Sequence, residues 1–137
     1  MIAYDIDGVF IPDQRITDGN LLEVLRVRCE SLIPIFEPGG DYYVITGRPK
    51  SDKKDTLDWF HNLFINPPIK IFHDNEDMAK AHEYKLKVLE ENKDITVFIE
   101  SDLNQVSFLR ENISRKMKII HFEEMIYDRI REIENEG

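Results

Sequence analysis

Short, almost uninterrupted apolar runs recur along this chain and alternate with segments of helical periodicity. The runs cover residues 1–4, 42–45, 69–72, 95–99 and 117–120. A strand with apolar residues at consecutive positions is buried on both faces, which is typical of a parallel sheet that carries helices on each side. Parallel strands are joined by right-handed crossovers. The sequence therefore predicts an α/β fold, a three-layer α/β/α sandwich with a mainly parallel sheet.

The segments between these runs have the features of helices. One begins at Asp18 or Asn20, and another follows Ser51, where Leu57 and Phe60 recur at helical spacing while Trp59 lies one position off the stripe. The predicted helices cover residues 18–28, 51–64, 75–91, 103–110 and 122–133. The short run at 32–36 is either an extra strand or a connector. With no linker or repeat, the 137 residues are expected to form one domain.

Charge and composition exclude several classes of protein. The formal net charge is −9, which argues against a broad nucleic-acid surface, because such a surface needs clustered basic residues. No apolar stretch approaches the roughly 20 residues of a membrane span, and no signal peptide is visible. The single cysteine, Cys29, excludes an internal disulfide and fits a reducing compartment. We therefore expect a cytoplasmic protein without membrane association.

Two acidic residues follow the first apolar run. Asp5 and Asp7 are two positions apart, so in an extended chain their side chains point to the same side. Gly8 then allows the backbone to turn. Carboxylates held this close either share a proton or bind a cation.

Other polar residues follow later apolar runs. Thr46-Gly47-Arg48 comes directly after the second run, and Glu100-Ser101-Asp102 after the fourth. Lys85 lies between them on a predicted helix. Because parallel strands end at the same edge of a sheet, where open α/β sheets bind their ligands, we expect these residues to meet.

This ordered set resembles the haloacid dehalogenase (HAD) superfamily of phosphotransferases. Four motifs carry the resemblance: DIDGV at 5–9, ITGR at 45–48, Lys85, and FIESD at 98–102. The first two are the specific ones. The fourth departs from the family pattern, which ends this strand in Asp-Asp or Gly-Asp. The resemblance implies a HAD-like, Rossmann-like domain with no or a minimal cap, because the intervals between motifs hold little beyond the predicted core elements.

The resemblance also assigns roles at the first acid pair. It implies a magnesium-dependent phosphatase, a phosphoric monoester hydrolase in which Asp5 is the nucleophile and forms an aspartyl phosphate. Asp7 would be the general acid and base. The Mg2+ ligands would be the Asp5 carboxylate, the Asp7 main-chain carbonyl and an acid of the fourth motif. Glu100 directly follows the strand and Asp102 also fits a helix N-cap, so the sequence leaves both open.

The remaining roles concern the bound phosphate. The resemblance gives Thr46 and Gly47 as phosphate-binding groups at a strand-to-helix junction. Arg48 either clasps a phosphate or reaches solvent. Lys85 would stabilise charge on the nucleophile and phosphate, with Lys80 and Lys87 as the neighbouring alternatives. Unit charges about 4 Å apart repel by about 4 kcal/mol at an effective dielectric near 20, so several anions together need a divalent ion.

The substrate is expected to be phosphorylated, and it is either a small molecule or the end of a polymer. The basic residues Arg48, Lys50, Lys53 and Lys54 are either an anionic substrate handle or a solvated helical turn. Oligomeric state cannot be read from the sequence. Two other functions remain open: a catalytically silent HAD-fold binding protein, for which the altered fourth motif is the reason, and a phospho-receiver signalling domain, whose motif order differs.

Overall fold

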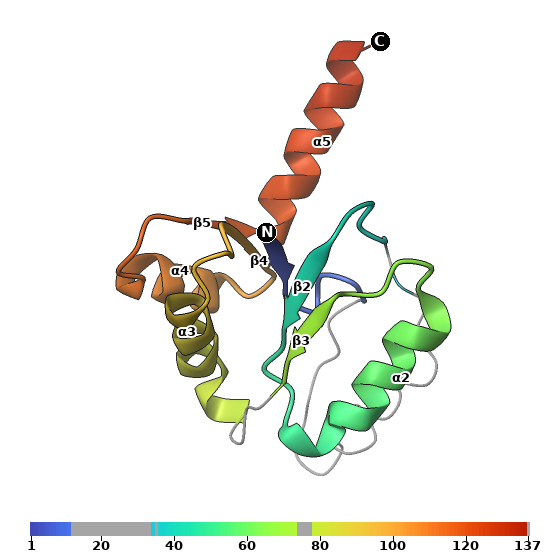
Figure 1. Ribbon diagram of the computed structural model, residues 1–137. Helices are drawn as coiled ribbons and strands as arrows, with labels where there is room; N and C mark the ends of the chain where they lie inside the picture. The colour runs from blue at the N-terminus through green and yellow to red at the C-terminus, as the bar shows by residue number, and fades with distance from the viewer. Residues whose placement is uncertain (12–33, 35, 74–77, 137) are drawn as a thin grey trace.

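All five strands of the sheet are parallel. The structure, a computed structural model, describes residues 1–11, 34, 36–73 and 78–136 (Figure 1). The strands are β1 (Ile2–Tyr4), β2 (Tyr42–Ile45), β3 (Lys70–Phe72), β4 (Val97–Glu100) and β5 (Lys118–His121). Their order in the sheet is β3-β2-β1-β4-β5, and every neighbouring pair is parallel. The predicted α/β class with a parallel sheet is confirmed, and its topology is compatible with a Rossmann-like sandwich.

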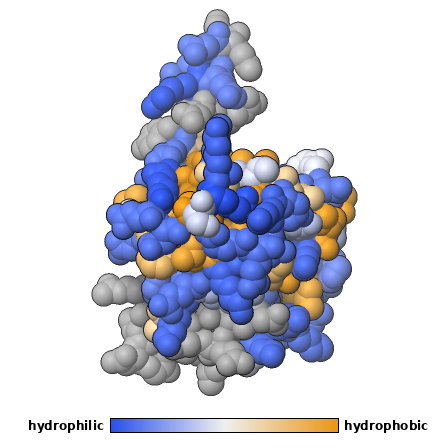
Figure 2. Space-filling view, turned by 60° about the vertical axis from the view of Figure 1, so that its left-hand side comes forward, coloured by the Kyte–Doolittle hydropathy of each residue, from blue (hydrophilic) through white to orange (hydrophobic). Residues whose placement is uncertain are grey.

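Helices cover both faces of this sheet. They are α2 (Lys53–Leu63), α3 (Ala81–Glu91), α4 (Leu103–Asn112) and α5 (Phe122–Glu136), with 3-10 turns η1 (Lys50–Asp52) and η2 (Met78–Lys80) ahead of α2 and α3. In Figure 1, α2 lies on one side of the sheet, α3 and α4 lie on the other, and α5 extends away from it. The face seen in Figure 2 is largely hydrophilic.

Alternation along the strands divides the core into two parts. Tyr4, Val44 and Ile99 belong to the cluster on the α2 side, which also holds Trp59 and Phe60. Their strand neighbours Ala3, Ile45 and Phe98 belong to the cluster with α3 and α4. Successive side chains of a strand point to opposite faces, so runs that are apolar at every position supply both clusters.

The strand order places a topological switch point between β1 and β4. The chain leaves β1 for β2 and β3 on one side, then crosses to β4 and β5 on the other. The two central strands are in register at Tyr4 and Ile99, and the Asp5 amide extends the ladder by donating to the Ile99 carbonyl at 2.9 Å. A crevice at the carboxyl ends of such strands is where open α/β sheets bind ligands. Asp5 and Glu100 are the residues at these two ends.

The structure also differs from the expected helices. Residues 18–28, Cys29 and most of the 32–36 run lie outside the described residues, as does most of the interval between the first two motifs. The described part of the next interval, between Gly47 and Lys85, holds η1, α2, β3, η2 and the start of α3. The predicted helix at 75–91 is a regular α-helix from Ala81. Trp59, expected one position off the apolar stripe, is buried, because it packs edge-on against Phe60 and Phe64. Leu63 of the same helix is 43% exposed. No helix within the described residues is long and apolar enough to cross a bilayer.

Candidate active site

The first acid pair lies on a tight, well-anchored turn. Gly8 has a φ of 84°, which a residue with a side chain rarely adopts, and its amide donates to the Ile11 carbonyl at 2.8 Å. The amides of Val9 and Phe10 both donate to the Ile6 carbonyl. The four apolar residues of this turn are fully buried: Ile6, Val9, Phe10 and Ile11. The core therefore fixes the backbone from which Asp5 and Asp7 project.

Asp5, Glu100 and Lys85 form a buried cluster at the switch point. The Lys85 ammonium lies 2.6 Å from Glu100 Oε2 and 3.3 Å from Asp5 Oδ1. All three residues are at most 6% exposed, whereas the alternative lysines Lys80 and Lys87 are exposed. The structure thus brings together Asp5 after β1, Glu100 of β4 and Lys85 of α3, which are far apart in sequence. Of the three lysines, Lys85 is the one that lies in this cluster.

Burial and charge shift the protonation of this cluster. Burial, and next the charge of Glu100, raises the pKa of Asp5 well above its usual value of 3.8, although Lys85 acts in the opposite direction. Burial lowers the pKa of Lys85, but the carboxylates of Asp5 and Glu100 outweigh it, and the net shift is upward. The Lys85 ammonium therefore faces the carboxyl groups of both Asp5 and Glu100.

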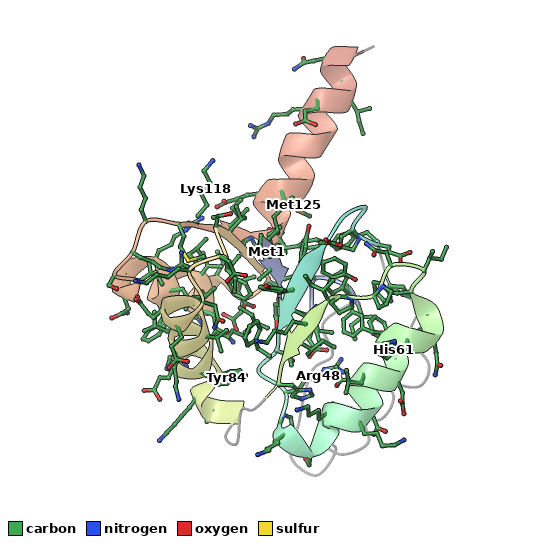
Figure 3. The ribbon with its side chains drawn as sticks, viewed as in Figure 1. Met1, Arg48, His61, Tyr84, Lys118 and Met125 are labelled. Atoms are coloured by element: carbon green, nitrogen blue, oxygen red, sulfur yellow. The ribbon has the colours of Figure 1, made fainter. Side chains whose placement is uncertain are left out.

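Asp7 is held by a different cation. Arg48 donates from Nε to Asp7 Oδ2 at 2.9 Å and from Nη2 to Asp7 Oδ1 at 2.8 Å, a two-bond fork. Figure 3 labels Arg48 near the start of α2. The guanidinium is buried, with Arg48 2% exposed, and it also donates to Thr56 Oγ1 at 3.2 Å. Asp52 lies 3.7 Å away. The predicted phosphate-binding arginine is therefore turned toward the second acid of the pair, so Asp5 and Asp7 each have their own cation.

Thr46 and Gly47 shape the turn after β2. Thr46 is fully buried, and its hydroxyl oxygen accepts a hydrogen bond from the Arg48 amide at 3.1 Å, which fixes the turn. A Cβ on Gly47 would lie 2.6 Å from the Cβ of Ala81 and 3.7 Å from Lys85 Cε. Glycine at this position allows the first turn of α3 to approach the strand end. That approach brings Lys85 within reach of the site.

The altered fourth motif divides its two acids between two tasks. Glu100 Oε1 accepts from the amides of Ser101 and Asp102 at 3.0 and 3.2 Å, which leaves Oε2 directed at Lys85. Asp102 is exposed and is the N-cap of α4, where its carboxylate accepts from the amides of Asn104 and Gln105. Glu100 is therefore in the cluster with Asp5, and Asp102 is engaged at the helix end.

Sequence reasoning missed several residues that hold the site together. The Ser101 hydroxyl donates to the Asp7 carbonyl at 2.8 Å, and His121 Nε2 lies 2.8 Å from the Ser101 carbonyl oxygen. Gln105 accepts from Lys85 at 2.7 Å. The position of His121 directly after the last apolar run was the one available signal, since that run ends at the same edge of the sheet. No sequence pattern marks Ser101 or Gln105, because their partners come from other strands and helices.

The donor atoms fit a magnesium ion. The described residues contain no group of three or more His, Cys, Asp or Glu side chains arranged around a common metal position. They do hold two buried acids, Asp5 and Glu100, at neighbouring strand ends, and the main-chain carbonyl of Asp7 accepts a hydrogen bond from Ser101 of the fourth motif. Mg2+ takes one or two carboxylates with retained waters. The Asp5 and Glu100 side chains both face the Lys85 ammonium, at 3.3 and 2.6 Å.

The basic residues after Thr46-Gly47 do not form one patch. Lys50 and Lys53 are exposed, Arg48 is buried, and Lys54 pairs with Asp58 at 3.0 Å on the surface of α2. Lys50, Lys53 and Lys54 are therefore the exposed members of the predicted substrate handle, and Arg48 is not part of it.

Comparisons with known proteins add no assignment. A scan against protein-family models, a search of curated proteins and a search of solved structures each found no match to this chain. The fold class follows from the sheet and its helices, and the chemistry has to be argued from the site residues themselves.

Proposed function

We propose that this protein is a HAD-like, magnesium-dependent phosphohydrolase that cleaves a phosphomonoester through an aspartyl phosphate on Asp5. The observation that carries the proposal is the convergence of Asp5, Glu100 and Lys85 at the switch point of a parallel sheet. A buried, under-compensated pair of carboxylates costs stability, and such costs are concentrated at functional sites. The substrate class is a phosphorylated small molecule or polymer end.

The chain's own residues account for both half-reactions. An Asp5 carboxylate oxygen forms a bond to phosphorus while the ester P–O bond breaks, and the leaving oxygen takes a proton from Asp7. A water then attacks phosphorus and gives its proton to Asp7, and the bond between Asp5 and phosphorus breaks. Inorganic phosphate leaves, and both acids return to their initial states. Lys85 stabilises negative charge on Asp5 and on the transferred group.

Asp5, Glu100 and the carbonyl oxygen of Asp7 would hold the magnesium ion. When bound, the ion supplies positive charge that lets a phosphate dianion approach two carboxylates. Asp102 is assigned to the α4 cap rather than to the metal, because it is exposed at the helix end whereas Glu100 is buried in the cluster with Asp5. Thr46 and Gly47 are assigned to the phosphoryl oxygens, since they occupy the strand-to-helix turn beside Lys85.

Arg48 is assigned to Asp7 rather than to the substrate. Its two hydrogen bonds fix the orientation of the Asp7 carboxylate, which has to face the leaving oxygen. Before it can act as an acid, Asp7 takes up a proton from solvent at one carboxylate oxygen, and the Arg48 hydrogen bond to that oxygen is given up. Arg48 is thus the positioning residue of the proposed acid and base.

Hydrolysis of p-nitrophenyl phosphate tests the proposal. We expect turnover that requires Mg2+, is abolished in Asp5→Asn, and is slowed by about 10²–10⁴-fold in Asp7→Asn. The matched control is Asp58→Asn, an exposed acid on α2 that is remote from the cluster and should leave turnover unchanged. Activity that survives in Asp5→Asn would remove the aspartyl-phosphate mechanism.

A silent binding protein is the second candidate. The observation that favours it is the saturation of the acids: Asp7 has both carboxylate oxygens held by Arg48, and Glu100 accepts from Lys85 and two amides. The absence of turnover on p-nitrophenyl phosphate, nucleotides and phosphorylated DNA ends, together with Mg2+ binding by calorimetry, would support this candidate.

A further inference from the structure

Lys85 has a third acceptor that is not an acid. Its ammonium carries three protons. Glu100 Oε2 and Asp5 Oδ1 lie 2.6 and 3.3 Å from Nζ, and Nζ donates to Gln105 Oε1 at 2.7 Å. Gln105 comes from α4, a different element from those that carry the two carboxylates. Acceptors on β1, β4 and α4 together define the position of the ammonium group on α3.

Helix capping does not explain the place of the Gln105 side chain. Gln105 is the third residue of α4 after the Asp102 cap, where a glutamine ordinarily reaches back to the amide of the cap residue. Here Glu100 Oε1 accepts that amide at 3.2 Å. The Gln105 backbone still takes part in the cap, since its amide donates to Asp102 Oδ1 at 3.2 Å. Its side chain is therefore available to face Lys85.

We propose that Gln105 is a positioning residue that holds the Lys85 ammonium against Asp5 and Glu100. The role rests on the proposed function, because it matters for turnover only if Lys85 assists transfer to Asp5. A lysine side chain has four rotatable bonds to its charge, so an ammonium held by three separate elements is confined to one position. The proposal extends the site to α4.

The neutrality of Gln105 is part of the role. Asp5 and Glu100 already outnumber the single positive charge of Lys85, and an incoming phosphate is anionic. A third carboxylate in this place would hold the ammonium equally well but would add repulsion against the substrate. Glutamine supplies an acceptor oxygen without that charge, so position and charge can be separated by mutation.

Three variants and two measurements test the proposal. Gln105→Met keeps the length of the side chain and removes the acceptor, Gln105→Glu keeps the acceptor and adds charge, and Ser107→Ala is the control at an exposed position of the same helix. The first measurement is the proton exchange rate of the Lys85 ammonium by 15N NMR, assigned through its own side-chain carbons. We expect slow exchange in the wild type, acceleration of about tenfold in Gln105→Met, and slow exchange restored in Gln105→Glu. Equal rates in wild type, Gln105→Met and Ser107→Ala would overturn the proposal.

The second measurement is steady-state hydrolysis of p-nitrophenyl phosphate with Mg2+. Gln105→Met is expected to lower kcat by about tenfold with little change in KM, whereas Gln105→Glu is expected to raise KM by about tenfold through repulsion. A wild-type kcat in Gln105→Met would overturn the positioning role while leaving the phosphatase intact. An inactive wild type would instead overturn the proposed function, and the exchange rates would still decide whether Gln105 holds Lys85.

Discussion

Replacing Arg48 with methionine removes the buried partner that donates two hydrogen bonds to Asp7. Arg48 is 2% exposed and the Asp7 side chain is 16% exposed. Loss of one partner from a fully buried ion pair costs about 3–5 kcal/mol, because the other charge is left uncompensated. Some water reaches Asp7, which screens its charge, so we expect about 2–3 kcal/mol for Arg48→Met. Asp7→Asn should cost less, since Asp52 remains 3.7 Å from Arg48.

Urea unfolding followed by circular dichroism measures these costs. With a slope of about 1–3 kcal/mol per molar urea, the expected loss lowers the midpoint by about 0.7–3 M. The double variant Arg48→Met/Asp7→Asn should be more stable than the sum of the two single losses predicts, by about 1–2 kcal/mol, because position 7 then carries no charge that needs the guanidinium. Asp52 loses its contact with Arg48 in both variants that lack Arg48, so that loss is common to them. Lys54→Met is the matched control: it breaks a pair of similar length, 3.0 Å, whose side chains are 87% and 54% exposed. Such surface pairs contribute about 0–1 kcal/mol.

A midpoint for Arg48→Met equal to that of Lys54→Met would refute this reasoning. Additive losses in the double variant would also refute it. Kinetics then separates the two roles of Arg48. A residue that acts through Asp7 lowers kcat when removed, whereas one that binds substrate phosphate directly raises KM with kcat unchanged. The second result would restore the role that the sequence suggested.

Three further changes test other parts of the site. Gly47→Ala puts a Cβ 2.6 Å from the Cβ of Ala81, so the start of α3 has to move. We expect the free energy of unfolding in urea to fall by about 1–3 kcal/mol. An unchanged urea midpoint would contradict the close approach of α3 to Gly47. Asp102→Ala should lower the free energy of unfolding by about 0.5–2 kcal/mol, because α4 loses its N-cap. Calorimetry should show unchanged Mg2+ affinity in Asp102→Ala and weaker Mg2+ binding in Glu100→Gln. The opposite order of affinities would make Asp102 the ligand. The pKa of Asp5 is raised on folding, so above its ordinary pKa of 3.8 the native state binds more protons than the unfolded state. The free energy of unfolding without metal should therefore fall as the pH rises from 3.8 through the raised pKa of Asp5. Asp5→Asn should show a smaller decrease in unfolding free energy over this pH range and should be more stable than the wild type at neutral pH. Urea midpoints of wild type and Asp5→Asn that change in parallel with pH would contradict this explanation.

The sequence alone determined the fold class. Short runs of apolar residues at consecutive positions, as in Val97-Phe98-Ile99, are typical of a strand that is covered on both faces, and that pattern is local. The acid pair, Thr46-Gly47 and Glu100 could also be located, because each directly follows such a run and parallel strands end at one edge. The glycine at position 8 was informative for the same reason, since a positive φ is a local requirement.

Only the tertiary structure decided which charged groups face each other. Arg48 and Lys85 carry the same charge and both looked like phosphate ligands, yet one is turned toward Asp7 and the other toward Asp5 and Glu100. Glu100 and Asp102 are two residues apart, and their division between the cluster and the helix cap depends on where α4 begins. Pairing, burial and the resulting pKa shifts depend on distances between separate elements, which no local pattern contains. Local chemistry therefore located the site along the chain, and packing between elements determined what each group does there.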